Sequence, residues 1–232
     1  MVFRSVRRTS RKAIVLHSGG LDSTVCLLKA LNGGRKVISL GIDYGQRHKI
    51  ELEYARQQSK RFGIPRRVLR VEWDKPIRPI PVNRSPAEMR RAVSAAFLPG
   101  RNAVFLMLAC AEAAGMGATE VWIGVNAIDF SGYPDCRPEF IAAFQEMISR
   151  AIPGGPRIVA PLLHWPKARI ARAAAAFGLQ RGDFWCCYRP HLTAVGIEPC
   201  GRCDACILHK HAWLGVKLRT LATRTPRSTS RD

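Results

Sequence analysis

The sequence predicts an α/β protein with a parallel sheet of about five strands, helices on both faces of that sheet, and a small C-terminal metal-binding lobe. Strand-like and helix-like segments alternate over residues 12–180, and a glycine-rich turn follows the first strand. Four cysteines then recur at short spacings within residues 187–206. Parallel strands need long, usually helical connections, so this alternation favours a parallel sheet.

Each expected element rests on a local pattern. Short apolar runs that end at turn residues predict strands at 12–17, 36–42, 67–71, 120–124 and 157–160. Helices are expected at 22–31, 51–62, 102–114, 138–150 and 167–177. Prolines crowd residues 74–99, which indicates an irregular insertion and a candidate active-site flap. The expected organisation is a basic tail at 1–11, a main domain at 12–180, a metal-binding lobe at 181–215 and a second basic tail at 216–232.

The chain is strongly basic, with a formal net charge of +20 over 232 residues. Part of this charge lies in the two tails: Arg4, Arg7, Arg8, Arg11, Lys12, Lys217, Arg219, Arg224, Arg227 and Arg231. We favour a solvated basic surface and keep nucleic-acid binding as the alternative. The sequence has neither a long apolar run nor the apolar core of a signal peptide, so we expect a cytoplasmic protein without a membrane span.

The glycine-rich turn, with the sequence SGGLDST at 18–24, has the features of a phosphate-binding loop. Its two glycines allow a sharp turn and a close approach to a ligand, and the following amides and helix start face an anion. Asp22 either caps the helix or holds Mg²⁺ against the phosphates. Neither GxxxxGK[ST] nor GxGxxG is present. A turn that only caps a helix is the alternative, which the preceding strand disfavours.

The C-terminal cysteines indicate a metal site. Cys187, Cys200, Cys203 and Cys206 follow the spacing C-x12-C-x2-C-x2-C, which suits tetrahedral thiolate ligation of Zn²⁺ at a closed, structural site. An iron–sulfur cluster and a metal-free cluster stay open as alternatives. The neighbouring Cys186 could replace Cys187 as a ligand. The other three cysteines are expected to be buried thiols.

Several segments together resemble one enzyme family. SGGxDS after a first strand resembles the pyrophosphate loop of the PP-loop ATP pyrophosphatases. DYGQRH at 43–48, PGRN at 99–102, DFSGYPDCR at 129–137, Pro161-Leu162 with Lys167, and the cysteine segment closely resemble the 7-cyano-7-deazaguanine synthases, also called preQ0 synthases. The resemblance extends from about Ala13 to about Trp213, nearly the whole chain.

The resemblance implies a Rossmann-like sheet of the adenine nucleotide alpha hydrolase type, and a homodimer. It implies an ATP-dependent ligase that converts 7-carboxy-7-deazaguanine and ammonia to the nitrile, on the route to queuosine and archaeosine. It places the four zinc ligands on Cys187, Cys200, Cys203 and Cys206. It places the ATP-binding stretch on His17, Ser18, Gly19, Gly20, Leu21, Asp22, Ser23, Thr24, Val25, Cys26 and Leu27.

Candidate site residues follow from this chemistry. Adenylation turns a carboxylate oxygen into part of a leaving group, so positioning and charge stabilisation at phosphorus matter most. The catalytic candidates are Ser18, Asp22, Ser23, Lys167 and Arg101. The last two would act as cations, and their alternative roles are a surface lysine and a helix-start arginine. The substrate-binding candidates are Asp129, Tyr133, Asp135, Arg137 and Asn102, with turn and N-cap duty as the alternative for the two aspartates.

The chain departs from the family pattern at a few positions: His17 replaces Phe, Phe184 and Cys186 replace hydroxyl residues, His164-Trp165-Pro166 replaces a polar lead-in, and His209 replaces Arg. Three alternatives therefore stay open beside the leading function. A paralogue could attach the deazapurine to a macromolecule. A tRNA-thiolating enzyme is disfavoured by the absence of a catalytic cysteine pair in the nucleotide domain. A zinc-ribbon nucleic-acid-binding module could carry an inactive loop.

Overall fold

A computed structural model describes residues 11–46, 49–72, 79–91, 97–127, 133–194 and 196–216. Its main sheet has five parallel strands in the order β3-β2-β1-β4-β5. The strands are β1 (Lys12–Leu16), β2 (Lys36–Asp43), β3 (Arg66–Arg70), β4 (Glu120–Trp122) and β5 (Arg157–Val159). The predicted parallel α/β fold is thus confirmed. The chain order reverses between β1 and β4, which is where open α/β sheets bind their ligands.

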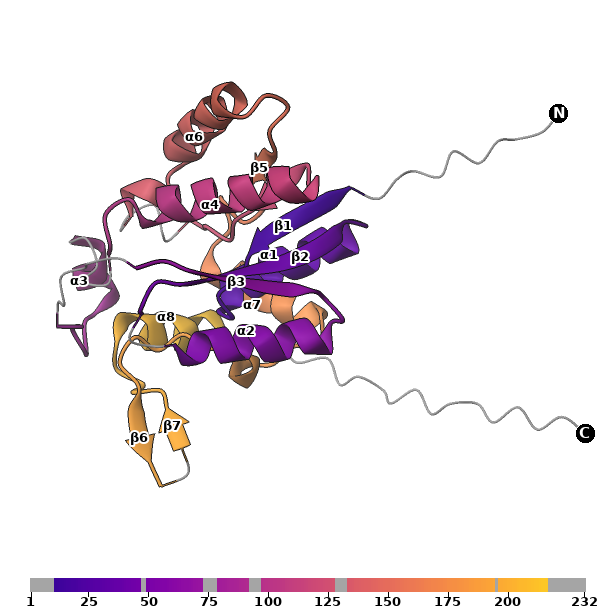
Figure 1. Cartoon of the computed structure of the whole chain (residues 1–232). Coiled ribbons are helices and arrows are strands. Elements are labelled where there is room, and N and C mark those ends of the chain that lie inside the picture. The colour runs from indigo at the N-terminus through magenta and orange to yellow at the C-terminus, as the bar shows by residue number, and fades with distance from the viewer. Residues whose placement is uncertain are drawn as a thin grey trace, which may run out of the picture.

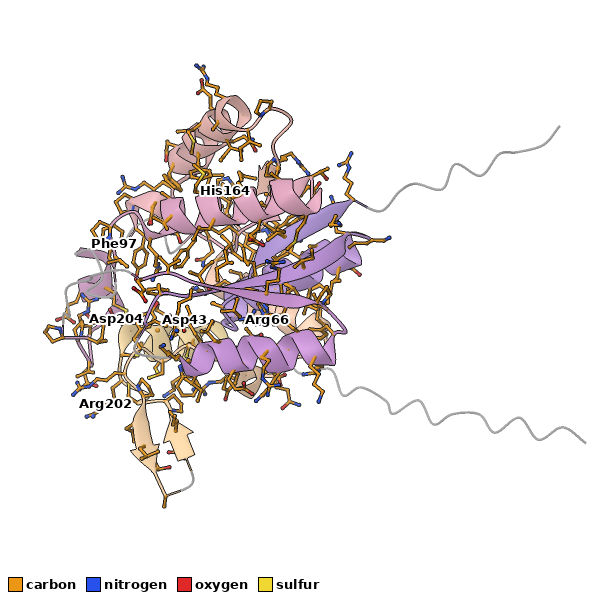
Figure 2. All side chains as sticks on the ribbon, in the orientation of Figure 1. Asp43, Arg66, Phe97, His164, Arg202 and Asp204 are labelled. Atoms are coloured by element: carbon orange, nitrogen blue, oxygen red, sulfur yellow. The ribbon has the colours of Figure 1, made fainter. Side chains whose placement is uncertain are left out.

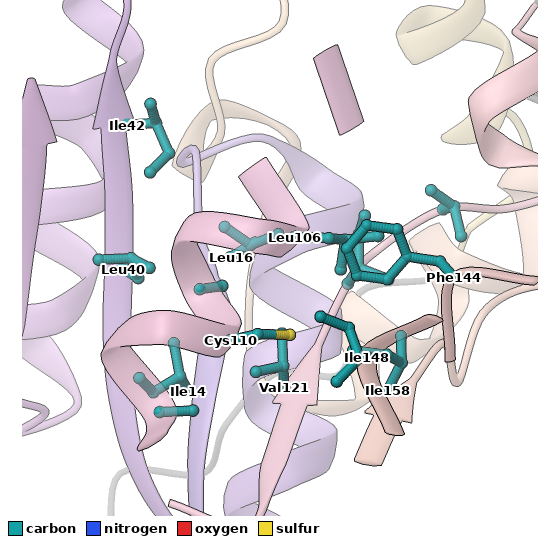
Figure 3. Close-up of a cluster of buried hydrophobic side chains, with 14 of the residues drawn as sticks. Ile14, Leu16, Leu40, Ile42, Leu106, Cys110, Val121, Phe144, Ile148 and Ile158 are labelled. Atoms are coloured by element: carbon teal, nitrogen blue, oxygen red, sulfur yellow. The ribbon is translucent and has the colours of Figure 1, made fainter. Parts of the chain in front are cut away.

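Helices cover both faces of the sheet (Figure 1). One face carries α4 (Arg101–Met116) and α6 (Pro138–Ala151), and the other carries α1 (Leu21–Asn32), α2 (Ile50–Arg61), α7 (Lys167–Ala176) and α8 (Asp204–Ala212). Alternation along β1 divides the core in two. Ile14 and Leu16 pack toward α4 and α6 (Figure 3), whereas Ala13 and Val15 pack toward α1 and α7.

The insertion predicted at 74–99 is partly regular. A short helix, α3 (Pro86–Arg91), lies within it, so the expectation of a wholly irregular segment is wrong there. Residues 79–85, here called the strap, run along the cysteine segment: Val82 bridges Cys203, and the Asn83 N–H donates to the Arg202 carbonyl at 2.8 Å. Arg84 forms an ion pair with Asp204, which Figure 2 labels at the start of α8. The strap therefore belongs to the C-terminal lobe as much as to the main domain.

The cysteine segment contains structure that the sequence did not predict. A two-stranded hairpin, β6 (His191–Thr193) and β7 (Gly196–Glu198), projects from the body between the first two cluster cysteines (Figure 1). Two 3-10 turns, η1 (Pro134–Cys136) and η2 (Arg181–Asp183), complete the described elements. Among the described helices, none has the length and apolarity that crossing a bilayer requires.

Candidate active site and metal centre

An open cleft with a volume of about 260 Å³ lies at the carboxyl ends of β1, β2 and β4. Its walls come from the phosphate loop, the strand ends, the first turns of α4, Lys167 and Tyr188. This is the edge where a doubly wound sheet places its ligands, because the strand order reverses there. The cleft is therefore the candidate active site.

The phosphate loop depends on Gly19 for its shape. Gly19 has φ +91°, and a Cβ at this position would lie 2.3 Å from the Glu51 carbonyl oxygen and 2.7 Å from the Ala55 nitrogen. Only glycine fits there. Gly20 is the N-cap of α1 and has no side-chain capping bond. Asp22 is instead the second residue of α1, so the interpretation that it caps the helix is wrong.

Asp22 forms an ion pair with Lys167, although 145 residues separate them in the chain. α1 and α7 pack together and bring the pair into the cleft. The carboxylate offers Oδ2 to the lysine, while its Oδ1 is buried without a hydrogen-bond partner. A buried oxygen without a donor is a ready ligand for a cation. Two predicted catalytic residues thus meet in one wall of the cleft.

The rest of the predicted ATP-binding stretch divides between cleft and core. His17, Ser18, Gly20, Asp22 and Ser23 line the cleft. The Ser18 and Ser23 hydroxyls lie 3.2 Å apart, and Ser23 donates to the Gly20 carbonyl at 3.1 Å. The remaining members face the protein interior. In particular, Val25, Cys26 and Leu27 are fully buried in the core beside α7.

His17 lies under the loop as a neutral, hydrogen-bonded side chain. Its Nε2 lies 2.9 Å from the Gln58 amide oxygen, which can only accept, so Nε2 carries the proton. Its Nδ1 accepts from the Ser39 hydroxyl at 2.9 Å. Burial and the nearby Arg66 charge lower the pKa of His17 to about 3. His17 therefore supports the loop and does not exchange protons near neutral pH.

Arg101 begins α4 directly after Gly100, which has φ +71°. Its guanidinium lies among Tyr44, Tyr133 and Tyr188, and it forms a side-chain hydrogen bond with Tyr44. Phe105 stacks obliquely on Tyr44, with ring centroids 5.2 Å apart. All these side chains line the cleft. One end of the cleft is thus an aromatic chamber around the Arg101 guanidinium, which suits a flat, anionic ring.

The other predicted substrate residues have mixed positions. Asp135 is buried and accepts the Asn102 backbone N–H at 2.9 Å, so its carboxylate holds the first turn of α4. Asn102 lines the cleft, but its side-chain amide donates to the Asp135 carbonyl at 3.2 Å. Arg137 is exposed at the N-cap of α6. Asp129 lies outside the described residues. The Asp135 contact matches the capping alternative better than base recognition.

The four predicted metal ligands come together. The Sγ atoms of Cys187, Cys200, Cys203 and Cys206 all lie within 4.8 Å of one another. Tetrahedral ligation with Zn–S bonds of about 2.3 Å requires such close sulfurs. Backbone N–H groups of Cys200 and Arg189 donate to the Cys187 sulfur at 3.2 and 3.3 Å, as suits a thiolate. Cys186 is not one of the four, which favours Cys187 as the ligand.

The metal lobe touches the active site directly. The Trp185 backbone N–H donates to the Gly19 carbonyl at 3.3 Å, and the Trp185 ring packs on Tyr54 with ring centroids 5.5 Å apart. Tyr188, next to Cys187, lines the cleft. Phe184 and His209, which depart from the family pattern, also pack in this lobe. His209 is buried beside Phe184, and its Nε2–H donates to the Arg181 carbonyl at 3.1 Å. The lobe is thus a wall of the cleft as well as a metal centre.

Comparison with known proteins agrees with this geometry. Residues 12–217 match the family described as Queuosine biosynthesis protein QueC. This chain belongs to that family. It is 54% identical to a 7-cyano-7-deazaguanine synthase 2 of Rhodopseudomonas palustris, covering 89% of this chain and 99% of the relative. It is 40% identical to a 7-cyano-7-deazaguanine synthase of Solidesulfovibrio magneticus, covering 86% and 90%. The family predicted from the motifs is confirmed.

Among solved structures, the QueC-family chain resembles the U34-tRNA thiolase NcsA of Methanococcus maripaludis, with a TM-score of 0.50 and 15% identity. The match covers 76% of this chain and 60% of the thiolase. At this identity the likeness concerns the fold alone. It supports the predicted parallel α/β sheet.

Proposed function

We propose that this chain is an ATP-dependent 7-cyano-7-deazaguanine synthase that uses the cleft for both the nucleotide and the deazapurine. Family membership supports the activity. One observation carries the assignment of the site. The phosphate loop with its Asp22–Lys167 pair and the aromatic chamber around Arg101 line the same cleft. The two halves have the chemistry that ATP and a carboxylated purine-like ring require.

The loop half would hold the ATP phosphates. The Gly20 amide, the start of α1 and the Ser18 and Ser23 hydroxyls offer donors to the phosphate oxygens. The buried Asp22 Oδ1 fits a Mg²⁺ ligand, and Mg²⁺ would neutralise charge on the departing pyrophosphate. Lys167 is held by Asp22 and supplies a second cation beside the α-phosphorus. The site thereby stabilises charge at the phosphorus that the substrate attacks.

The conversion of the carboxylate to the nitrile requires two activations by ATP, one of the carboxylate and one of the amide. A carboxylate oxygen of the substrate attacks the α-phosphorus of ATP, and pyrophosphate leaves. Ammonia attacks the acyl carbon, and AMP leaves with the carboxylate oxygen to give the amide. The amide oxygen attacks a second ATP, and pyrophosphate leaves again. Loss of AMP and of the amide protons then gives the nitrile. The protein supplies position and fixed charge throughout.

The chamber half would hold the ring. Tyr133 and Phe105 offer faces for stacking, and Arg101 would bind the substrate carboxylate and bring it toward the loop. Asn102 and Tyr133 stay substrate-binding predictions, as do Asp129 and Arg137. Because Asp135 already holds α4, we assign it the role of shaping the chamber.

The cysteine cluster would hold one structural Zn²⁺, since four thiols leave no position for a substrate. We also propose a homodimer. Val68 and Met107 are 51% and 39% exposed on β3 and α4, elements that the Arg67–Glu112 ion pair joins at 3.1 Å. Exposed apolar side chains on neighbouring elements suit an interface. A reduced cytoplasm, where free thiols persist, suits the metal site.

The test is direct. The purified protein is incubated with ATP, Mg²⁺, ammonium and 7-carboxy-7-deazaguanine, and the nitrile and AMP are followed by mass spectrometry. Asp22→Asn and Lys167→Met are expected to lower turnover by at least about 100-fold with zinc content unchanged. Glu146→Gln, which alters an exposed pair with Arg150, is the matched control and is expected to keep full activity.

The outcomes separate the alternatives. AMP without nitrile would favour a macromolecular acceptor for the same chemistry. No nucleotide turnover, with salt-sensitive tRNA binding, would favour a nucleic-acid-binding module that uses the +20 charge. Full turnover in Asp22→Asn would show that the phosphates bind elsewhere.

A further inference from the structure

Gln58 lies beneath the phosphate loop, on the buried side of α2, and is 5% exposed. Its Oε1 accepts the His17 Nε2–H at 2.9 Å and the Thr24 hydroxyl at 3.1 Å. Its Nε2 donates to the Gly19 carbonyl at 3.3 Å and the Asp183 carbonyl at 2.7 Å. A glutamine amide has two donors and two acceptor positions, so Gln58 uses all of its hydrogen-bonding capacity. Gln58 therefore joins α2 to the phosphate loop and to η2.

The bond to Gly19 fixes the direction of one peptide group. The Gly19 carbonyl receives two donors, the Gln58 side-chain amide and the Trp185 backbone N–H. No peptide bond in the described ranges is cis. In a trans peptide the C=O and N–H point in opposite directions, so the Gly20 N–H points away from Gln58. Gly20 lines the cleft, and its N–H points to the Ser18 hydroxyl, 3.4 Å away, which lines the cleft as well; the amide therefore faces the space assigned to the phosphates.

Glycine needs such a restraint. Gly19 is required for its positive φ and its close approach to α2, but glycine also leaves the peptide planes on either side free to rotate. A rotation of the plane between Gly19 and Gly20 would replace the N–H in the cleft with a carbonyl oxygen, which repels phosphate. Two hydrogen bonds to the carbonyl prevent that rotation.

We propose that Gln58 is a positioning residue that holds the Gly19–Gly20 peptide with its amide directed at the pyrophosphate portion of ATP. The proposal rests on the proposed function, because it takes ATP phosphates as the ligand of the loop. Gln58 is not among the residues that line the cleft, and it acts through the residues that it bonds: His17, Gly19 and Thr24. Its contribution should therefore appear in the binding of the β- and γ-phosphates and not in the binding of the adenosine portion.

The variant that tests this is Gln58→Leu, with Gln57→Leu as its control. Gln57 is the next residue of the same helix, is exposed, and donates to Glu53 at 2.9 Å on the surface. Affinities for α,β-methylene-ATP, which resists cleavage, and for AMP are measured by calorimetry on the full chain. We expect Gln58→Leu to weaken binding of the ATP analogue by about tenfold or more and binding of AMP by less than about twofold. Gln57→Leu should change neither affinity.

A double variant keeps the test sound if Gln58→Leu unfolds. The single change leaves the buried His17 N–H with only the Thr24 hydroxyl, 3.4 Å away, as a weak acceptor, which lowers stability for reasons unrelated to ATP. His17→Phe/Gln58→Leu replaces both partners with apolar groups, so it should recover most of the unfolding temperature. It still lacks the donor to Gly19, and its affinity for the ATP analogue should stay low.

Three results would overturn the proposal: analogue affinity within twofold of the unaltered protein in a folded Gln58 variant, equal weakening of the analogue and AMP, or full recovery of analogue affinity in the double variant. Failure of the proposed function is recognised separately. In that case Asp22→Asn would keep full turnover, and the ATP analogue would not bind at the loop.

Discussion

Replacing Glu120 with glutamine is expected to lower the free energy of unfolding by about 3 kcal/mol at pH 7 without changing the KM for ATP. Glu120 begins β4 and its side chain is 2% exposed. Arg157 and Arg35 donate to its two oxygens at 2.9 and 3.2 Å, and the Trp122 indole N–H donates at 2.8 Å. Removing the charge therefore takes a buried anion away from several donors at once.

The magnitude follows from the pKa. Burial alone would raise the pKa of Glu120, but the hydrogen bonds from Arg157, Trp122 and Arg35 outweigh it and lower the pKa from 4.5 to about 2. Each pKa unit corresponds to about 1.4 kcal/mol, which gives about 3 kcal/mol. The folded-state pKa lies below the unfolded one, so this stabilisation is complete above pH 4.5 and is lost as the pH falls toward 2.

Urea unfolding followed by circular dichroism, with Zn²⁺ present, measures the effect at pH 7 and pH 5. The loss in Glu120→Gln should be nearly the same at both pH values, because both lie above the range in which the carboxyl titrates. Glu146→Gln, whose pair with Arg150 is 66–78% exposed, should lose less than about 0.5 kcal/mol. A comparable small loss in Glu120→Gln, or a loss that disappears by pH 5, would refute the reasoning. The KM should not change, since Glu120 lies at the opposite edge of the sheet from the cleft.

Two further predictions concern the lobe and the buried histidine. Removing the metal with a chelator, or replacing Cys203 with serine, should lower the unfolding temperature and weaken binding of α,β-methylene-ATP. The reason is that Trp185 and the strap both pack against the cysteine cluster. A metal-free protein with unchanged affinity for the ATP analogue would contradict this prediction. His17 has its pKa lowered from 6.5 to about 3, so the stability that depends on its neutral form is present above pH 6.5 and falls by about 2 kcal/mol by pH 5. His17→Phe should abolish that slope in urea titrations, and an unchanged slope would show that another group titrates.

Local patterns predicted much of the fold and of the loop. The strand–turn–helix order and the SGGLDST sequence located the phosphate loop because both are written in consecutive residues. The spacing of the cysteines located the metal cluster for the same reason. The continuous burial of β1, with successive side chains packed into the two core layers in turn, follows directly from its apolar residues, since neighbouring side chains point to opposite faces.

Contacts between distant segments could not be predicted in this way. Nothing near Gln58 indicates that its amide reaches His17 and Gly19, since the bonds depend on how α2 packs under the loop. Asp135 holds the first turn of α4 by accepting the N–H of Asn102, 33 residues away. Because that partner is distant in the sequence, the Asp135 carboxylate looks available to bind a base when the sequence is read alone. The hairpin β6–β7 was missed because its strands have three residues each, too few to show an alternating pattern.

The bond between Trp185 and Gly19 has a consequence for the order of events during synthesis. The ribosome makes Trp185, the partner that restrains the phosphate loop, 166 residues after it makes Gly19. At rates of about 5–20 residues per second, the loop waits for roughly ten to thirty seconds before its geometry can be completed. We expect nascent chains that stop before the cysteine segment to bind ATP poorly, so that unfinished chains do not consume nucleotide. The phosphate loop would then become functional only after residues far downstream of it have been made.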